Sequence, residues 1–141
     1  MINLFKFIEK KRGYPIPFML KLINNIPLNE KELHVKGDLD LSYSKIKELP
    51  DNLEVGGNLN LRYSKIKELP NNLKVDGELD LLFTEIEKLP NNLKVGRSLS
   101  MEKTKIKELP DDLEVGLFIA VPHGKEQYFK DNFPEFANKI I

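Results

Sequence analysis

The stretch LEVGGNLNLRYSKIKELPNN, residues 53–72, is followed directly by LKVDGELDLLFTEIEKLPNN at 73–92 and LKVGRSLSMEKTKIKELPDD at 93–112. Each is twenty residues long, and a Leu-Pro pair stands at the same position in all three. LHVKGDLDLSYSKIKELPDN at 33–52 precedes them, and the truncated LEVGLFIAV at 113–121 follows. Because self-similarity at a short fixed period is typical of repeat proteins, we expect this part of the chain to wind as four coils and a final half-coil.

The pattern within one repeat, LxVxGxLxLxx(S/T)xIxxLPxx, indicates how a coil is built. Apolar and polar residues alternate in its first half, which is the period-two pattern of a half-buried strand. The proline after the last leucine prevents a helix from continuing there. Each repeat is therefore predicted to be one turn of a solenoid whose apolar columns stack on their equivalents in the next coil. In the first coil the predicted inward residues are Leu33, Val35, Leu39, Leu41, Ile46 and Leu49.

The run LxLxx(S/T)xIxxLP resembles the LxLxxNxLxxLP core of leucine-rich repeats, particularly the short twenty-residue kind of bacterial effectors and some phage-encoded proteins. The resemblance implies an α+β repeat solenoid, a short leucine-rich-repeat stack with parallel strands, capped by N- and C-terminal helices. Two features depart from the family pattern. The glycine column at 37, 57 and 77 is broken by Arg97, and hydroxyl side chains replace the family's asparagine, which predicts a weaker hydroxyl ladder. The hydroxyl residues are Ser44, Ser64, Thr84 and Thr104.

The repeats divide the chain into three segments of one structural domain. Residues 1–32 are predicted to form a helical N-terminal cap, with one helix ending near Gly13 and a second over FMLKLINN. Residues 33–121 are predicted to form the solenoid. Residues 122–141 are predicted to form a helical C-terminal cap, with helices over KEQYFKDNF and PEFANKII, because the apolar ends of a solenoid must be covered. The side chains expected to cover the last coil are Tyr128, Phe129, Phe133, Phe136, Ile140 and Ile141.

The charge balance limits the kinds of partner. The 141 residues include 22 Lys and Arg and 22 Asp and Glu, which argues against a general binder of nucleic acid or anionic membranes. No apolar run reaches the roughly 20 residues that cross a bilayer, and the first basic cluster follows the N-terminal apolar residues, unlike a secretory signal. We therefore expect a protein of the cytoplasm of the producing or infected cell. A membrane-surface helix is the less favoured interpretation of Lys6, Lys10, Lys11 and Arg12.

The outward side chains of the strand segments are expected to form a binding face, which the family resemblance implies is the concave one. Three aromatic residues at one position of successive repeats would stack in register about 4.8 Å apart. Exposed aromatic residues and arginine commonly anchor protein interfaces. The alternative is that the rings only pack on one another and stabilise adjacent coils. The candidate partner-binding residues are Tyr43, Tyr63, Phe83, Arg62, Asp40, Asn60, Asp80 and Lys103.

Catalysis and metal binding are not expected. The acidic columns form rows of carboxylates rather than the cage of six to eight oxygens that Ca²⁺ needs. The chain has no cysteine, which excludes disulfides and thiolate chemistry. His34 and His123, which could serve as bases at neutral pH, are predicted to lie at opposite ends of the stack. We therefore expect no enzyme, no cofactor and no metal.

These features favour a non-catalytic protein–protein interaction module that uses its strand face, with a basic patch on the partner. The family resemblance further implies a phage or bacterial inhibitor or adaptor that acts on a host or defence protein. The alternative is a structural, self-assembling protein that associates through its caps, with the apolar end 137–141 as an interface. The oligomeric state is left open.

Overall fold

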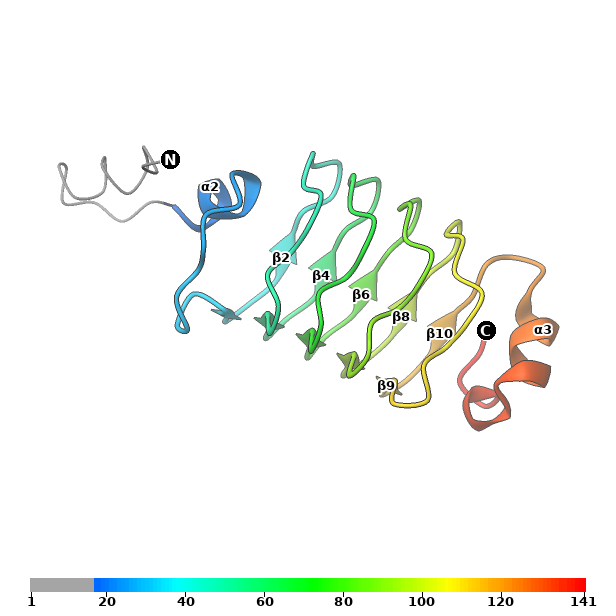
Figure 1. Ribbon diagram of the computed structural model, residues 1–141. Helices are drawn as coiled ribbons and strands as arrows, with labels where there is room; N and C mark the ends of the chain where they lie inside the picture. The colour runs from blue at the N-terminus through cyan, green and yellow to red at the C-terminus, as the bar shows by residue number, and fades with distance from the viewer. Residues whose placement is uncertain (1–16) are drawn as a thin grey trace, which may run out of the picture.

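The computed structural model describes residues 17–141, which form a parallel-strand β-solenoid with a short helix at each end (Figure 1). Each coil contributes one two-residue strand to each of two five-stranded sheets, and every strand pairs with its equivalent twenty residues away. The first sheet consists of β1 (His34–Val35), β3 (Glu54–Val55), β5 (Lys74–Val75), β7 (Lys94–Val95) and β9 (Glu114–Val115). The second consists of β2 (Leu39–Asp40), β4 (Leu59–Asn60), β6 (Leu79–Asp80), β8 (Leu99–Ser100) and β10 (Ile119–Ala120). The predicted parallel solenoid of twenty-residue period is confirmed.

The two strands of a coil are separated by a bend where the sequence pattern predicts one continuous strand. At this bend neighbouring coils approach so closely that a Cβ on Gly57, Gly77, Gly96 or Gly116 would lie less than 3.0 Å from the backbone of the preceding coil. Each bend begins with two residues, and from the second coil onward at least one of the two is glycine. The bend pairs are Gly56-Gly57, Asp76-Gly77, Gly96-Arg97 and Gly116-Leu117. The glycine column broken at Arg97 is therefore continued one residue earlier.

The stacked apolar columns form one hydrophobic core that runs through all the coils. In the middle of the stack the enclosure is complete, and Leu59, Leu61 and Ile66 are 0% exposed. Leu33 and Val35 are only half-buried, because their coil is the first of the stack. No coil could bury these columns alone, so the stability of the solenoid comes from stacking.

At the N-terminal end, helix α2 (Phe18–Ile23) lies within the helix predicted from FMLKLINN. Its Leu22 joins the common core, and Phe18 and Leu28 pack partly against that core. The exposed side of the same helix is apolar, with Met19, Leu20 and Ile23 between 38% and 54% exposed. The helix predicted to end near Gly13 lies outside the described residues.

An ion pair joins α2 to the turn that leads into the first coil. The ammonium nitrogen of Lys21, a buried residue, lies 2.7 Å from Glu32 Oε1. Glu32 N–H donates to Asn29 Oδ1, and Asn29 N–H donates to Glu32 Oε2, both at 2.9 Å. The hydrogen bond from Lys21 holds the pKa of Glu32 below its ordinary value of 4.5, aided by the Asn29 N–H and opposed by partial burial.

We predict that the stabilisation provided by Glu32 is lost in acid. A carboxyl group whose pKa is lowered by folding contributes fully above the unfolded pKa, near 4.5, and loses this contribution as pH falls through the folded pKa. The urea midpoint of the wild type should therefore exceed that of Glu32→Gln at neutral pH, and the difference should shrink as the pH drops below 4.5. Urea titrations of both proteins across this range measure it. A difference that stays constant in acid would contradict the assignment.

At the C-terminal end, α3 (Glu126–Asn132) is followed by the 3₁₀ turn η1 (Pro134–Phe136). Of the side chains expected to cover the last coil, Phe129, Phe136 and Ile140 are buried in the common core. Phe133 packs partly against it, whereas Tyr128 and Ile141 are exposed. The helix predicted over PEFANKII is wrong beyond its first turn, because the chain then runs alongside β10, with Ile140 bridging Ile119.

The C-terminal tail takes the hydrogen-bonding place of a further coil. Ile119 N–H donates to Lys139 O at 2.8 Å, and Ile141 N–H donates to Ile119 O at 3.0 Å. In the coils before it, the valine carbonyl of each first strand accepts from the bend of the next coil, as Val95 O does from Gly116 N–H at 2.9 Å. The last such carbonyl, Val115 O, accepts from the Lys139 ammonium instead. The tail thus occupies the edge of β10, where unpaired strand groups would otherwise favour aggregation, and its Lys139 side chain satisfies one carbonyl of β9.

Candidate protein-binding face

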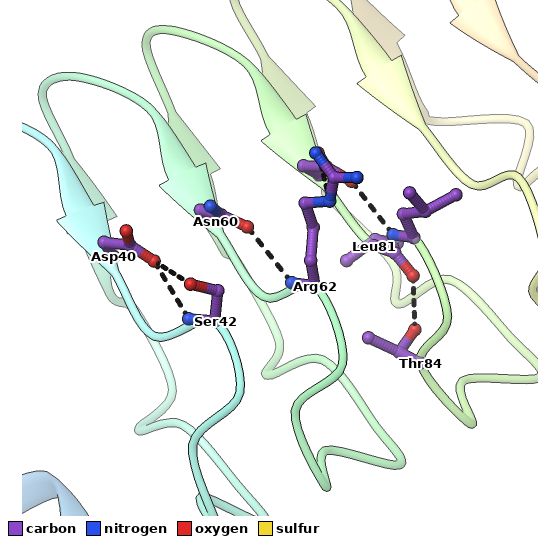
Figure 2. Close-up of polar contacts among 8 residues, drawn as sticks. Asp40, Ser42, Asn60, Arg62, Leu81 and Thr84 are labelled. Carbon is purple, nitrogen blue, oxygen red and sulfur yellow. Dashed lines mark hydrogen bonds and ion pairs between the residues drawn. The ribbon is translucent and has the colours of Figure 1, made fainter.

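Three polar residues turn the chain out of the second sheet at the ends of β2, β4 and β6. Asp40, Asn60 and Asp80 each accept, through Oδ1, a hydrogen bond from the backbone N–H two residues later, at 2.9–3.1 Å (Figure 2). This arrangement is an Asx turn, a common device for reversing a backbone. The three residues are predicted to contact a partner, and what the structure shows is that each of them holds a turn of the backbone.

The first of these turns has an additional bond. The Ser42 hydroxyl donates to Asp40 Oδ1 at 2.6 Å, beside the bond from Ser42 N–H at 3.0 Å (Figure 2). Both bonds lower the pKa of Asp40 below its ordinary value of 3.8, and the bond from the Ser42 hydroxyl has the larger effect. Asp40 is exposed, so it presents a carboxylate to solvent at neutral pH.

The residue that follows each turn has a left-handed backbone, and in three coils this residue is aromatic. The φ angle is 57° at Tyr43, 55° at Tyr63 and 57° at Phe83, and Lys103 continues the column with 56°. For residues with a Cβ other than asparagine and aspartate this conformation is uncommon and costs about 1–2 kcal/mol. The alternating pattern of apolar and polar residues does not reveal this left-handed backbone.

The three rings form a stacked column that we call the aromatic ladder: Tyr43, Tyr63 and Phe83. The ring centroids of Tyr43 and Tyr63 are 4.8 Å apart with an interplanar angle of 11°, and those of Tyr63 and Phe83 are 4.6 Å apart at 14°. The three residues nevertheless remain exposed: the exposed fraction is 74% for Tyr43, 39% for Tyr63 and 45% for Phe83. The stacking in register is therefore as predicted, and the ladder both joins adjacent coils and offers an aromatic surface to solvent.

Charged side chains lie at the same corner of the coils. Arg62, directly before Tyr63, places Nε 3.6 Å from Asp80 Oδ2, so it links the second coil to the third (Figure 2). Lys103 is exposed and extends the column into the fourth coil without a ring. The predicted site residues thus share one corner of the solenoid. The rings are in mutual contact, whereas Asp40 and Asn60 bond within their own turns.

A second ladder, which the sequence reasoning missed, occupies the corner after the first three Leu-Pro pairs. Asn72 Nδ2 donates to Asn52 Oδ1 at 3.0 Å, and Asn92 Nδ2 donates to Asn72 Oδ1 at 3.1 Å. All three asparagines are left-handed, with φ between 58° and 63°. The available signal was an asparagine at the second position after proline in three successive repeats, because asparagine tolerates this backbone better than most residues.

The hydroxyl column bonds backbone carbonyls, but only in the third and fourth coils. Thr84 Oγ1 donates to Leu81 O at 2.8 Å (Figure 2) and Thr104 Oγ1 donates to Met101 O at 2.6 Å, both within one coil. The hydroxyls of Ser44 and Ser64 have no hydrogen-bond partner among the described residues. A hydroxyl is too short to bridge neighbouring coils about 4.8 Å apart, a distance that the longer asparagine amide does span at the other corner.

The two histidines each lie beside a carboxylate, at different ends of the stack. His34 Nδ1 is 2.9 Å from Glu54 Oε2 in the first sheet, and His123 Nδ1 is 3.8 Å from Glu126 Oε1 at the start of α3. Within residues 17–141, no group of three or more His, Asp or Glu side chains is placed to hold a metal ion. Nor does this part of the chain contain a helix of the length and apolarity needed to cross a membrane.

Comparisons with protein-family models, with curated proteins and with solved structures gave no match. The corner that carries the aromatic ladder is therefore interpreted from its own geometry. It combines stacked exposed rings, a partly exposed arginine and carboxylates that are fixed by their turns.

Proposed function

We propose that the chain is a non-catalytic protein–protein interaction module that binds a partner protein through the aromatic ladder and the charged groups beside it. The observation that carries this proposal is the combination of exposure and left-handed backbone at Tyr43, Tyr63 and Phe83. Exposed aromatic residues and arginine anchor protein interfaces, and unfavourable backbone conformations concentrate at functional sites.

Folding alone gives little reason for aromatic residues at this corner. The same chain places asparagines at its other left-handed corner, where they fit with less strain and still join the coils. Each stacked ring pair contributes about 0.5–1.5 kcal/mol, which is comparable to the strain of about 1–2 kcal/mol per left-handed residue. Contact with a partner supplies the missing reason to keep aromatic side chains there.

The proposed partner carries basic side chains around an apolar or aromatic patch. Asp38, Asp40 and Glu78 are exposed on the second sheet's outward side and complement such charges. A basic side chain can also stack on the Tyr43 ring, an interaction of about 0.5–2 kcal/mol. Five strands about 4.8 Å apart span only about 20 Å, less than a standard interface side, so modest affinity follows unless the ends of the solenoid contribute.

The proposals on the type of repeat fold and on the cellular role rest partly on the resemblance of the repeats to leucine-rich repeats. The repeat pattern supports a fold of the short leucine-rich-repeat type. Burial of Leu22 in α2 and of Phe129 in α3 within one core supports the view that both ends act as caps. We further propose a cytoplasmic inhibitor or adaptor of phage or bacterial origin that acts on a host or defence protein, which is supported by the resemblance alone.

The test is affinity capture from a lysate with the wild type and with the double variant Tyr43→Asn/Tyr63→Asn. Asparagine accepts a left-handed backbone, so the variant should fold and keep its circular dichroism spectrum. We expect it to retain less than about a tenth of the captured partner, as for loss of an interface hot spot. The control, Lys45→Asn/Lys65→Asn, changes exposed residues of the same coils outside the ladder and should retain the partner. A folded ladder variant that keeps every partner would exclude this surface.

Self-assembly through the ends is the second candidate, favoured by exposed apolar side chains at both of them. Met19, Leu20 and Ile23 are exposed on α2, and Phe118 and Ile141 are 49% and 61% exposed near the C-terminus. Pairing of the tail with β10 argues against edge-to-edge stacking of copies at that end. Light scattering distinguishes the two candidates, because self-assembly requires a mass that rises with concentration.

A further inference from the structure

A hollow of about 260 Å³ lies between the last complete coil and α3. It exists because the chain leaves the path of the solenoid after Val121. A further twenty-residue coil would place residues 124–127 beside 104–107, but the helix α3 begins at Glu126 instead. The flank of the last complete coil is therefore only partly covered. The apolar part of the lining consists of Ile106, Pro122, Tyr128 and Phe129.

The floor of this hollow is well ordered by packing. Ile106 is 2% exposed and Phe129 is 1% exposed, so both belong to the core. Tyr128, 45% exposed, contacts Phe129 edge to face with ring centroids 5.4 Å apart, and its hydroxyl lies 3.4 Å from Lys107 O. The hollow is thus a preformed apolar site with one aromatic wall that is open to solvent.

Three exposed lysines surround the apolar floor. Lys105 and Lys107 come from the last complete coil, and Lys125 directly precedes α3. No aspartate or glutamate of the described residues lines the hollow, and none of these lysines forms an ion pair with a described carboxylate. Three other lysines of the solenoid do pair with carboxylates, among them Lys67 with Glu85 at 3.8 Å. Within the hollow itself the three lysines face no carboxylate, which favours an anionic occupant.

We propose that this hollow binds an acidic segment of a partner protein that inserts one bulky apolar side chain between the three lysines. The volume of about 260 Å³ is smaller than the roughly 300–1,000 Å³ of typical small-molecule sites, and it suits a single side chain. The lysines come from two elements, so several carboxylates flanking one anchor complement them better than one anionic group. This surface is separate from the aromatic ladder, and the two can bind different parts of one partner.

The probe for the test is a fluorescein-labelled peptide with one phenylalanine between two pairs of glutamates, followed by fluorescence anisotropy. We expect saturable binding that weakens at higher salt and shifts the NMR signal of the Ile106 methyl group. Replacing the peptide's phenylalanine by alanine, or using the variant Lys105→Glu/Lys125→Glu, should weaken binding at least about tenfold. The matched control, Lys45→Glu/Lys65→Glu, reverses lysines of the same column as Lys105 at the other end and should bind as the wild type does.

Three results would overturn the proposal. These are no saturable binding of the peptide to the wild type, equal affinity for the alanine peptide, and equal affinity of the folded Lys105→Glu/Lys125→Glu variant. Octanoate serves as a competing probe. If octanoate shifts the Ile106 methyl signal and the peptide does not, the hollow takes a small amphipathic anion, which also overturns the protein-segment assignment. None of these results bears on the aromatic ladder, whose variants lie in the first two coils.

Discussion

Replacing Gly96 by alanine is expected to lower the free energy of unfolding by about 3 kcal/mol, a typical cost of overpacking a tight contact. Gly96 is the one glycine in its bend, because Arg97 stands where Gly57 and Gly77 stand in other coils. A Cβ at this position would lie less than 3.0 Å from the carbonyl group of Asp76 in the preceding coil. That carbonyl is backbone and cannot rotate away as a side chain would, so the two coils would have to separate locally.

Gly37 provides the matched control. It occupies a bend of the first coil, and a Cβ added there would meet nothing within 4 Å among the described residues. Gly37→Ala should therefore change stability by no more than about 0.5 kcal/mol, with a slight gain where alanine restricts the unfolded chain. Urea unfolding of both variants and the wild type measures the contrast. Equal stability of the two variants would show that the close approach of coils at the bend does not constrain the residue there.

The bends show which part of this fold can be predicted from the sequence. The twenty-residue period and the alternation of apolar residues were sufficient for a parallel solenoid and its inward columns, because burial directly determines both patterns. The split of each coil into two short strands was not predictable in this way. The split follows from the close approach of neighbouring backbones at Gly57, Gly77 and Gly96. This approach depends on the distance between two coils, and the sequence of a single repeat does not reveal that distance.

The candidate site was likewise predictable in part. Equal spacing placed Tyr43, Tyr63 and Phe83 in one column, and the observed ring stacking follows from that spacing. Their left-handed backbone was not predictable, because aromatic residues rarely adopt this conformation. The polar residues that form the preceding Asx turns also fit the alternating pattern of an ordinary strand. The C-terminal tail was missed because Ile140 and Ile141 suit a helix face as well as a strand, and only pairing with β10 decides between them.

Phe129→Ala is expected to destabilise the protein by about 3–5 kcal/mol, the usual cost of removing a buried phenylalanine ring. Phe129 is 1% exposed and belongs to the same core as Ile119 and Val121 of the final half-coil. Its ring also lies 5.8 Å from that of Phe133. Truncation to alanine would leave a cavity where α3 meets the solenoid. Urea unfolding monitored by circular dichroism measures the loss.

The neighbouring residue Tyr128 supplies the control, because it lies on the same helix but is 45% exposed. Tyr128→Ala should cost no more than about 1 kcal/mol, as for most surface substitutions.

The position of the loosened structure gives a second measurement. Coils of a solenoid contact only their neighbours, so the loss of stability caused by Phe129→Ala should be greatest at the C-terminal end and spread inward from there. Amide hydrogen exchange should accelerate in β9 and β10 before it does in β3 and β5. If Phe129→Ala were as stable as Tyr128→Ala, α3 would be excluded as a cap. If exchange rose uniformly in all the coils, the stack would unfold as one unit, and the effect of α3 would extend to the first coil.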